Sequence, residues 1–208
     1  MPSGNSGTER PEGAGESRIG PNAILQVAAA LRAAAGEEAA RRVFAAAGLE
    51  AWLDHPPERM VPESAVAALH QALRAELDAA QARHVLQDAG VRTGDYVLAW
   101  RIPAPVRTLL RLLPPPLSGP LLLRAIERNA WTFVGSGTFS YRRGRPCLLE
   151  IRDNPVVAGE RAEQPVCHWH ASVFERLFQA LVNRRSQVRE VECAAAGGEA
   201  CRFELRYR

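Results

Sequence analysis

The chain has 208 residues and a formal net charge of +3, and all of its positive side chains are arginines because the sequence contains no lysine. A chain of this length normally folds as one domain with an ordinary apolar core. The arginines are scattered, so nucleic-acid binding is not predicted. We recognise no secretory leader and no apolar run long enough to span a membrane. These properties predict a cytoplasmic protein whose four cysteines are metal ligands, reactive thiols or packing residues rather than disulfides.

The first 78 residues are predicted to hold a tail and a helical unit. Residues 1–20 are rich in Gly, Ser, Glu and Pro, which predicts a disordered tail. Residues 21–78 should form N-terminal helices that pack on the rest of the chain, beginning with two helices broken at Gly36. A third, amphipathic helix is indicated by an apolar stripe at helical spacing, formed by Val66, Leu69, His70, Leu73 and Leu77.

The middle of the chain is also predicted to be helical. A helix over residues 79–89 should end at Gly90, and Asp95 should cap a short helix that carries Tyr96 and Trp100. Two further short helices should flank the proline run at 114–116. The leucines of these helices alternate with arginines and could rest on a membrane surface, although packing against the core is the favoured interpretation.

The pattern changes to a period of two at Trp131. Aromatic side chains alternate with polar ones from Trp131 to Tyr141, interrupted by Gly135 and Gly137, which predicts a strand with room for a ligand beside it. A second strand should follow, with Cys147, Leu149 and Ile151 on one face.

The C-terminal part is predicted to be a helix over residues 168–182 followed by strands over 187–193 and 201–207. The resulting fold class is α+β: a helical N-terminal half packed on an antiparallel sheet of about four strands, with one helix inserted between its hairpins.

Three cysteines are predicted to converge. Cys167 begins a helix, Cys193 ends a strand and Cys201 begins the paired strand, so a zinc site is a plausible arrangement if a fourth ligand is available. Glu190, His168 and His170 are the candidates. Strict alternation puts Glu190 on the face opposite Cys193, so this carboxylate reaches the site only if the strand bulges. The alternative is that the cysteines are small buried hydrophobes.

A ligand pocket is the second candidate site. An apolar cavity could be lined by a set of aromatic side chains, with ordinary core packing as the alternative for each of them. His70 is either a satisfied core histidine or an axial ligand to a bound metallotetrapyrrole. A hydride cofactor has no recognisable site, because Gly135-Ser136-Gly137 lacks the third glycine and the following helix of a dinucleotide fingerprint. The aromatic set is Tyr96, Trp100, Trp131, Phe133, Phe139 and Trp169.

The C-terminal text resembles the 4-vinyl reductase domain family. The resemblance rests on Pro165-Val166-Cys167-His168-Trp169, on Val191-Glu192-Cys193, and on Gly198 followed by Cys201-Arg202-Phe203-Glu204-Leu205, and it covers residues 79–208. It implies a ligand-binding domain over these residues, with a fold shared by sensors of aromatic compounds. It also implies a structural zinc ion held by Cys167, Glu190, Cys193 and Cys201, and therefore the bulge that Glu190 requires.

The resemblance further implies a role in bacteriochlorophyll synthesis. A non-catalytic binding protein or carrier is favoured, with Mg-protoporphyrin or its monomethyl ester as bound ligand and enzymes of the pathway as recipients. Arginines at the pocket rim would pair with the propionates of the ligand. The alternatives are an 8-vinyl reductase acting on divinyl (proto)chlorophyllide and a sensor of tetrapyrroles or small aromatic molecules. A homodimer and a peripheral position at the photosynthetic membrane are compatible with these roles.

Overall fold

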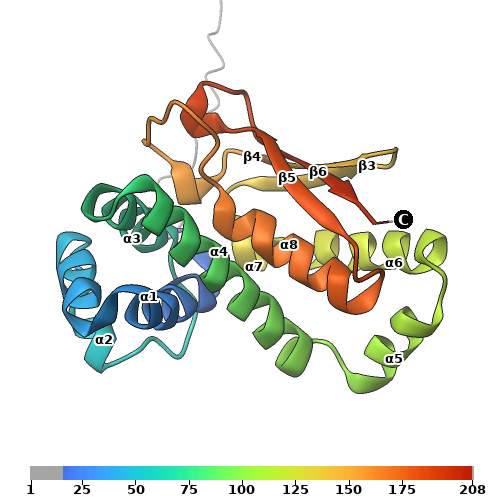
Figure 1. Ribbon diagram of the computed structural model, residues 1–208, viewed down its shortest axis with the longest axis horizontal. Helices are drawn as coiled ribbons and strands as arrows, with labels where there is room; N and C mark the ends of the chain where they lie inside the picture. Colours follow the sequence, from blue (N-terminus) through green and yellow to red (C-terminus); the bar gives the residue numbers. More distant parts are fainter. Residues whose placement is uncertain (1–15, 208) are drawn as a thin grey trace, which may run out of the picture.

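Two hydrophobic cores organise the chain, one among the N-terminal helices and one between a sheet and the later helices (Figure 1). The structure is a computed structural model and describes residues 16–207. Most of the expected tail, residues 1–15, lies outside the described residues. No helix within residues 16–207 is both long enough and apolar enough to cross a membrane.

The N-terminal core is built by four helices. They are α1 (Asn22–Ala46), α2 (Ala51–Asp54), α3 (Glu63–Glu76) and α4 (Ala79–Tyr96). Gly36 has φ 83° and ψ 174°, so α1 is two helical pieces joined at a sharp kink. The predicted break at Gly36 is therefore confirmed, and the predicted apolar stripe on α3 is buried in this core.

The predicted disorder up to Gly20 is wrong for the last residues of that range. Arg18–Ile19 forms strand β1, which pairs antiparallel with β2 (Val61–Pro62). Ile19 is only 1% exposed and belongs to the N-terminal core. A single buried isoleucine with two paired backbone segments is enough to order this end of the chain.

The predicted helix end at Gly90 is also wrong, because α4 continues to Tyr96 and then into a π-helical turn, Val97–Arg101. Gly90 and Gly94 face α8 (His168–Leu181) at close range. A Cβ atom at Gly90 would lie 2.5 Å from the carbonyl oxygen of Trp169, and one at Gly94 would lie 2.8 Å from Cγ of Arg176. The glycines thus allow two helices to approach closely, and Asp95 forms an ion pair with Arg176 at 2.7 Å instead of capping a helix.

Helices α5 (Ala104–Leu112) and α6 (Pro115–Arg128) flank the proline run as predicted. The predicted strand from Trp131 is wrong in its first half, since Trp131–Val134 is a helical turn, α7, and β3 begins at Thr138. The backbone N–H groups of Thr132 and Phe133 bond to carbonyls at the end of the preceding helical segment. Gly135, with φ 54°, then reverses the chain into the strand.

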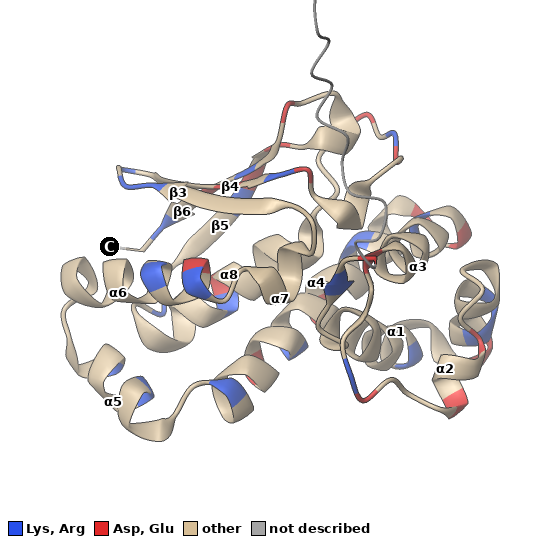
Figure 2. Ribbon diagram, turned by 180° about the vertical axis from the view of Figure 1, so that it is seen from behind, with Lys and Arg blue, Asp and Glu red and all other residues tan. Residues whose placement is uncertain are grey.

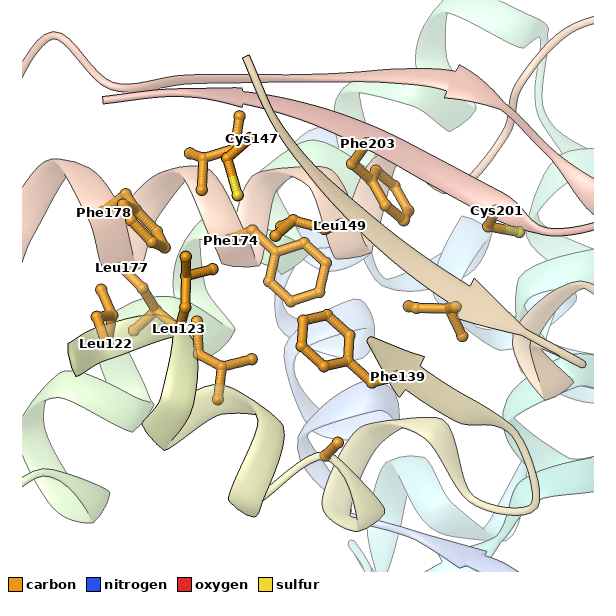
Figure 3. Packing of buried hydrophobic residues seen from close by; sticks show 14 of the residues in the cluster. Leu122, Leu123, Phe139, Cys147, Leu149, Phe174, Leu177, Phe178, Cys201 and Phe203 are labelled. Atoms are coloured by element: carbon orange, nitrogen blue, oxygen red, sulfur yellow. The ribbon is translucent and has the colours of Figure 1, made fainter. Parts of the chain in front are cut away.

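The sheet has the antiparallel order β3-β4-β6-β5, and the predicted α+β fold is confirmed. The strands are β3 (Thr138–Arg142), β4 (Cys147–Arg152), β5 (Gln187–Glu192) and β6 (Cys201–Arg206), with short 3-10 turns at Pro155–Val157 and Ala194–Ala196. Helix α8, between β4 and β5 in the chain, covers the apolar face of the sheet with α6 (Figure 1, Figure 3). The inward side chains of the two central strands are Cys147, Leu149, Ile151, Cys201, Phe203 and Leu205.

Candidate metal centre and aromatic core

Cys167, Glu190, Cys193 and Cys201 meet at one end of the sheet. Cys167 immediately precedes α8, Glu190 lies in β5, Cys193 follows β5, and Cys201 opens β6. One ligand atom from each of these residues lies within 4.8 Å of all the others. The three cysteines are buried and free of disulfides. The residues that the resemblance implied as ligands are therefore the ones that the fold brings together.

The spacing of the sulfur atoms suits a tetrahedral ion. The Sγ atoms of Cys167 and Cys193 are 3.8 Å apart, those of Cys193 and Cys201 are 3.9 Å apart, and those of Cys167 and Cys201 are 3.4 Å apart. Thiolates at about 2.3 Å from a tetrahedral zinc ion would be separated by about 3.8 Å. The donor set and its dimensions thus fit zinc.

A bulge in β5 brings Glu190 to this site. Glu190 pairs with Phe203, whereas Glu192 pairs with Arg202, so Val191 is the extra residue. Because paired residues of an antiparallel ladder share a face, Glu190 points inward with Phe203. The chain after the bulge then carries Cys193 inward as well, which is the irregularity that the alternation argument required.

The Glu190 carboxylate has one satisfied and one unsatisfied oxygen. Its Oε2 accepts a 2.7 Å hydrogen bond from the backbone N–H of Cys167, while Oε1 is buried with no hydrogen-bond partner. Burial, followed by the neighbouring Cys193, raises the pKa of Glu190 to about 8. A buried acceptor without a donor is costly, and a cation in the cluster would satisfy it.

The thiols are electrostatically coupled. Hydrogen bonding with Cys193 and Cys201 raises the pKa of Cys167, and the reciprocal contacts with Cys167 and Cys193 lower the pKa of Cys201. These opposite directions mean that the cluster accommodates one thiolate readily and resists further ionisation. A divalent cation would remove this resistance and allow all three thiols to ionise.

Asn154 is a contributor that the sequence reasoning missed. Its Nδ2 lies 3.5 Å from Sγ of Cys167 and 3.4 Å from Sγ of Cys201, as a donor to both. Its Oδ1 accepts a hydrogen bond from the backbone N–H of Val156, which fixes the amide. The only sequence signal was an Asn-Pro turn. Such outer donors orient thiolate ligands and neutralise part of their charge.

A second cluster, the aromatic core, fills the space between α7, α8 and the sheet. The rings of Phe133 and Phe139 have centroids 5.7 Å apart, and His170 lies 6.2 Å from Phe133 and 6.3 Å from Phe174. Neither ring nitrogen of His170 has a hydrogen-bond partner of normal geometry. Burial lowers the pKa of His170 to about 4, so the imidazole is neutral near pH 7. The aromatic core comprises Phe133, Phe139, Trp169, His170, Phe174 and Phe203.

Trp169 separates two buried histidines. Its ring centroid is 4.8 Å from that of His170 and 6.0 Å from that of His70. The indole N–H donates to Oγ1 of Thr93 at 3.2 Å. Nε2 of His70 is likewise buried without a partner, and burial lowers the pKa of this histidine well below its usual value. His168, the remaining candidate ligand, is outside the metal cluster.

Other side chains of the predicted pocket lie elsewhere. Trp100 is 77% exposed and Trp131 is 59% exposed, so neither joins the aromatic core, and Tyr96 lies at the end of α4. A surface hollow of about 790 Å³ between the end of α8 and β5 is polar and contains none of the predicted pocket residues. It is lined by Glu175, Gln179, Arg184, Arg185, Ser186, Gln187, Val188, Arg189, Glu204 and Arg206.

Comparisons with known proteins agree with this architecture. Residues 148–207 match the model of the 4-vinyl reductase domain family, which confirms the resemblance seen in the sequence. The chain is similar in fold to a mutant H-NOX protein from K. algicida, in its Fe(II) unliganded form, with a TM-score of 0.61, 14% identity, and 91% of this chain and 97% of that one covered.

Two curated relatives match nearly the whole length. The "Bacteriochlorophyll synthase 23 kDa chain" of Cereibacter sphaeroides is 50% identical over 90% of this chain and 90% of its own length. The protein of the same name from Rhodobacter capsulatus is 46% identical over 91% of this chain and 87% of its own length. Both alignments span the helical half as well as the sheet. The chain therefore belongs to the family of the bacteriochlorophyll synthase 23 kDa chains, with a 4-vinyl reductase domain at its C-terminal end.

Proposed function

We propose that this protein binds a Mg-porphyrin intermediate of bacteriochlorophyll biosynthesis without transforming it, and delivers it to an enzyme of the pathway. The observation that carries the proposal is the relationship to two proteins named as chains of bacteriochlorophyll synthase. The bound ligand would be Mg-protoporphyrin or its monomethyl ester.

The aromatic core is the proposed binding region. A flat apolar macrocycle gains most from stacking on rings, which this core supplies from α7, α8 and the sheet. His170 lies among these rings with a neutral imidazole and no hydrogen-bond partner, so it can donate a nitrogen lone pair to a central magnesium ion. His70 is the second such histidine and lies on the far side of Trp169.

Access to this core would be controlled by the α7–β3 turn. Phe133 precedes the turn, and its displacement would uncover His170. The turn is held by Glu63 of α3, whose carboxylate accepts hydrogen bonds of 2.7 Å from both the backbone N–H and the hydroxyl of Ser136. Opening this contact costs two charge-assisted hydrogen bonds and leaves the central strands β4 and β6 intact.

The metal centre would have a structural role in this scheme. We propose that Cys167, Glu190, Cys193 and Cys201 bind one zinc ion, which fixes the start of α8 against β5 and β6. His170 follows Cys167 by three residues, so the ion would also fix the position of the ring that faces the ligand. Zinc would supply binding free energy to the folded state and no catalytic step.

Titration of the purified full-length protein with Mg-protoporphyrin monomethyl ester tests the proposal. Saturable binding with a shifted pigment absorbance and quenched tryptophan fluorescence is expected. His170→Ala should weaken binding at least about tenfold, because one coordination bond is lost. His84→Ala is the matched control, since His84 is an exposed histidine of α4. Absence of saturable binding by the wild type would overturn the carrier.

The same preparation separates the carrier from a reductase. Divinyl protochlorophyllide is incubated with the protein and NADPH, or with reduced ferredoxin, and the pigment is analysed by mass. An unchanged pigment mass is expected for a carrier. A gain of two hydrogens that depends on the protein would replace the carrier by an 8-vinyl reductase.

A further inference from the structure

The exposed large apolar side chains are concentrated in one segment. Within the part of the chain that the structure describes, nine such side chains are found, and seven of them lie between residues 100 and 131. Leu112 is 78% exposed and Trp100 is 77% exposed, which is unusual for such side chains in a folded domain. The seven, which we term the apolar face, are Trp100, Val106, Leu109, Leu112, Leu117, Leu121 and Trp131.

Helix α6 contributes one continuous stripe to this face. Leu117, Leu121, Arg124 and Arg128 follow one another at intervals of four, three and four residues, so they occupy one side of the helix. All four are exposed, and Trp131 follows three residues later. The opposite side of α6 is buried in the C-terminal core through Leu122, Leu123 and Ile126.

Helix α5 extends the apolar face. Val106, Leu109 and Leu112 are exposed at intervals of three residues, while Leu110 is buried against the core. The two helices contact each other at the end of the molecule opposite the N-terminal helices (Figure 1). Each helix is thus amphipathic in the usual sense but carries more apolar surface than its packing uses.

The charge on this segment has a single sign. Residues 97–131 contain five arginines and one acidic residue, Glu127 (Figure 2). None of the ion pairs found within residues 16–207 involves these arginines, whereas Arg74, Arg176 and Arg202 elsewhere are paired with carboxylates. Two of the five donate to backbone carbonyls of neighbouring helices. The guanidinium groups of the other three, Arg101, Arg124 and Arg128, remain available to external anions.

We propose that the apolar face docks on an anionic lipid bilayer as a peripheral anchor. Leucine and tryptophan side chains would enter the boundary between headgroups and acyl chains, and the three available arginines would pair with lipid phosphates. Charge complementarity favours this occupant, because a surface with five arginines and one carboxylate matches a uniformly negative plane. The polar 790 Å³ hollow, which a protein side chain could fill, shares no residue with the apolar face.

Vesicle sedimentation of the full-length protein tests the anchor without any porphyrin, so the outcome is independent of the carrier proposal. Binding to vesicles with 40% phosphatidylglycerol, on the order of physiological anionic content, is compared with pure phosphatidylcholine. Wild type should bind the anionic vesicles, lose binding as salt is raised, and show a blue shift of tryptophan fluorescence. Arg124→Gln with Arg128→Gln should weaken binding roughly 25-fold, at about fivefold for each charge.

Leu112→Asn with Leu117→Asn should reduce vesicle binding at least about tenfold even at low salt, since two apolar side chains no longer enter the bilayer. Val91→Asn and Arg59→Gln, exposed residues outside the apolar face, should bind like the wild type. Circular dichroism confirms that each variant is folded. Failure of the wild type to sediment with anionic vesicles overturns the anchor, as does equal binding by the leucine variant. Saturable binding of the apolar face to a purified protein instead of to vesicles would identify a protein-docking surface and also overturn it.

Discussion

The backbone N–H of Cys167 donates a 2.7 Å hydrogen bond to Oε2 of Glu190, which ties the start of α8 to β5 where that strand bulges. The other oxygen of the carboxylate is buried and free to bind a cation. The bulge, the helix start and the candidate metal centre are therefore one local arrangement. Predictions about the metal can be tested by residues that share its surroundings but not its ligand atoms.

Cys193→Ala should abolish metal binding. Elemental analysis should find about one zinc ion per wild-type chain and almost none in the variant, because three ligands remain. The thermal midpoint should fall by roughly 10–20 °C for a loss of about 5 kcal/mol. Cys147→Ala is the matched control, since Cys147 is a buried cysteine of β4 outside the cluster. Full zinc retention by Cys193→Ala would rule out the proposed ligand set.

Glu190→Gln should weaken zinc binding and keep the fold. Glutamine can still accept the hydrogen bond from Cys167 but cannot supply a charged oxygen, so competition with a chelator should show an affinity about 10–100-fold lower. Glu192→Gln is the control on the same strand, because Glu192 pairs with Arg202 on the opposite face. Equal zinc affinity in the two variants would contradict a ligand role for Glu190.

Gly90→Ala should destabilise the protein although alanine is the better helix former. The new methyl group would lie 2.5 Å from the Trp169 carbonyl oxygen and 2.6 Å from Cβ of Ser172, so α4 and α8 must move apart. A loss of about 2–4 kcal/mol in the free energy of unfolding is expected. Gln87→Ala, at an exposed position of the same helix, should be nearly neutral. Urea titration distinguishes the two, and a neutral Gly90→Ala would disprove the close contact.

His170 should make stability depend on pH. Burial lowers its pKa to about 4 in the folded state, below the value of about 6.5 for an exposed histidine. The unfolded chain therefore binds more protons between these values, and stability falls as the pH drops from about 6.5 to about 4. The contribution of this residue is roughly 3 kcal/mol. His170→Phe should flatten the profile over this window, measured as the difference from wild type in urea titrations at several pH values. An identical pH dependence in both proteins would contradict the buried neutral imidazole.

Glu63→Ala should loosen the α7–β3 turn. Loss of its two hydrogen bonds to Ser136 should cost about 2–3 kcal/mol and, if the turn controls access to the aromatic core, speed porphyrin association several-fold. Stopped-flow mixing measures the association rate, and Glu58→Ala provides an exposed-glutamate control. An unchanged rate in a destabilised Glu63→Ala protein would place the access route elsewhere.

The sequence predicted elements whose signal is contained in their own periodicity. The stripe on α8 and the alternation in β4 and β6 needed no knowledge of their neighbours, and both are confirmed. The bulge was predicted from chemistry, because a carboxylate ligand at position 190 could not otherwise reach Cys193.

The errors concern residues whose role depends on a distant partner. Gly90 has the same local pattern whether it ends a helix or allows α8 to approach, and only the tertiary contact with Trp169 decides between them. Asn154 was missed for the same reason, since its amide acts on sulfur atoms contributed by later segments. Ile19 is one apolar residue at the end of a polar stretch, and its burial depends on Val61 being available to pair with it.

Trp169 belongs by sequence to α8, yet it is buried in the N-terminal core, while Cys167 and Phe174 on either side of it belong to the C-terminal core. The helix that starts at the metal centre therefore inserts side chains into both halves of the molecule. Removal of the ion should loosen both halves together, and amide hydrogen exchange in α1 and α3 should accelerate in step with exchange in β6. Zinc supply would then set the lifetime of the whole folded chain, including helices that make no contact with the ion.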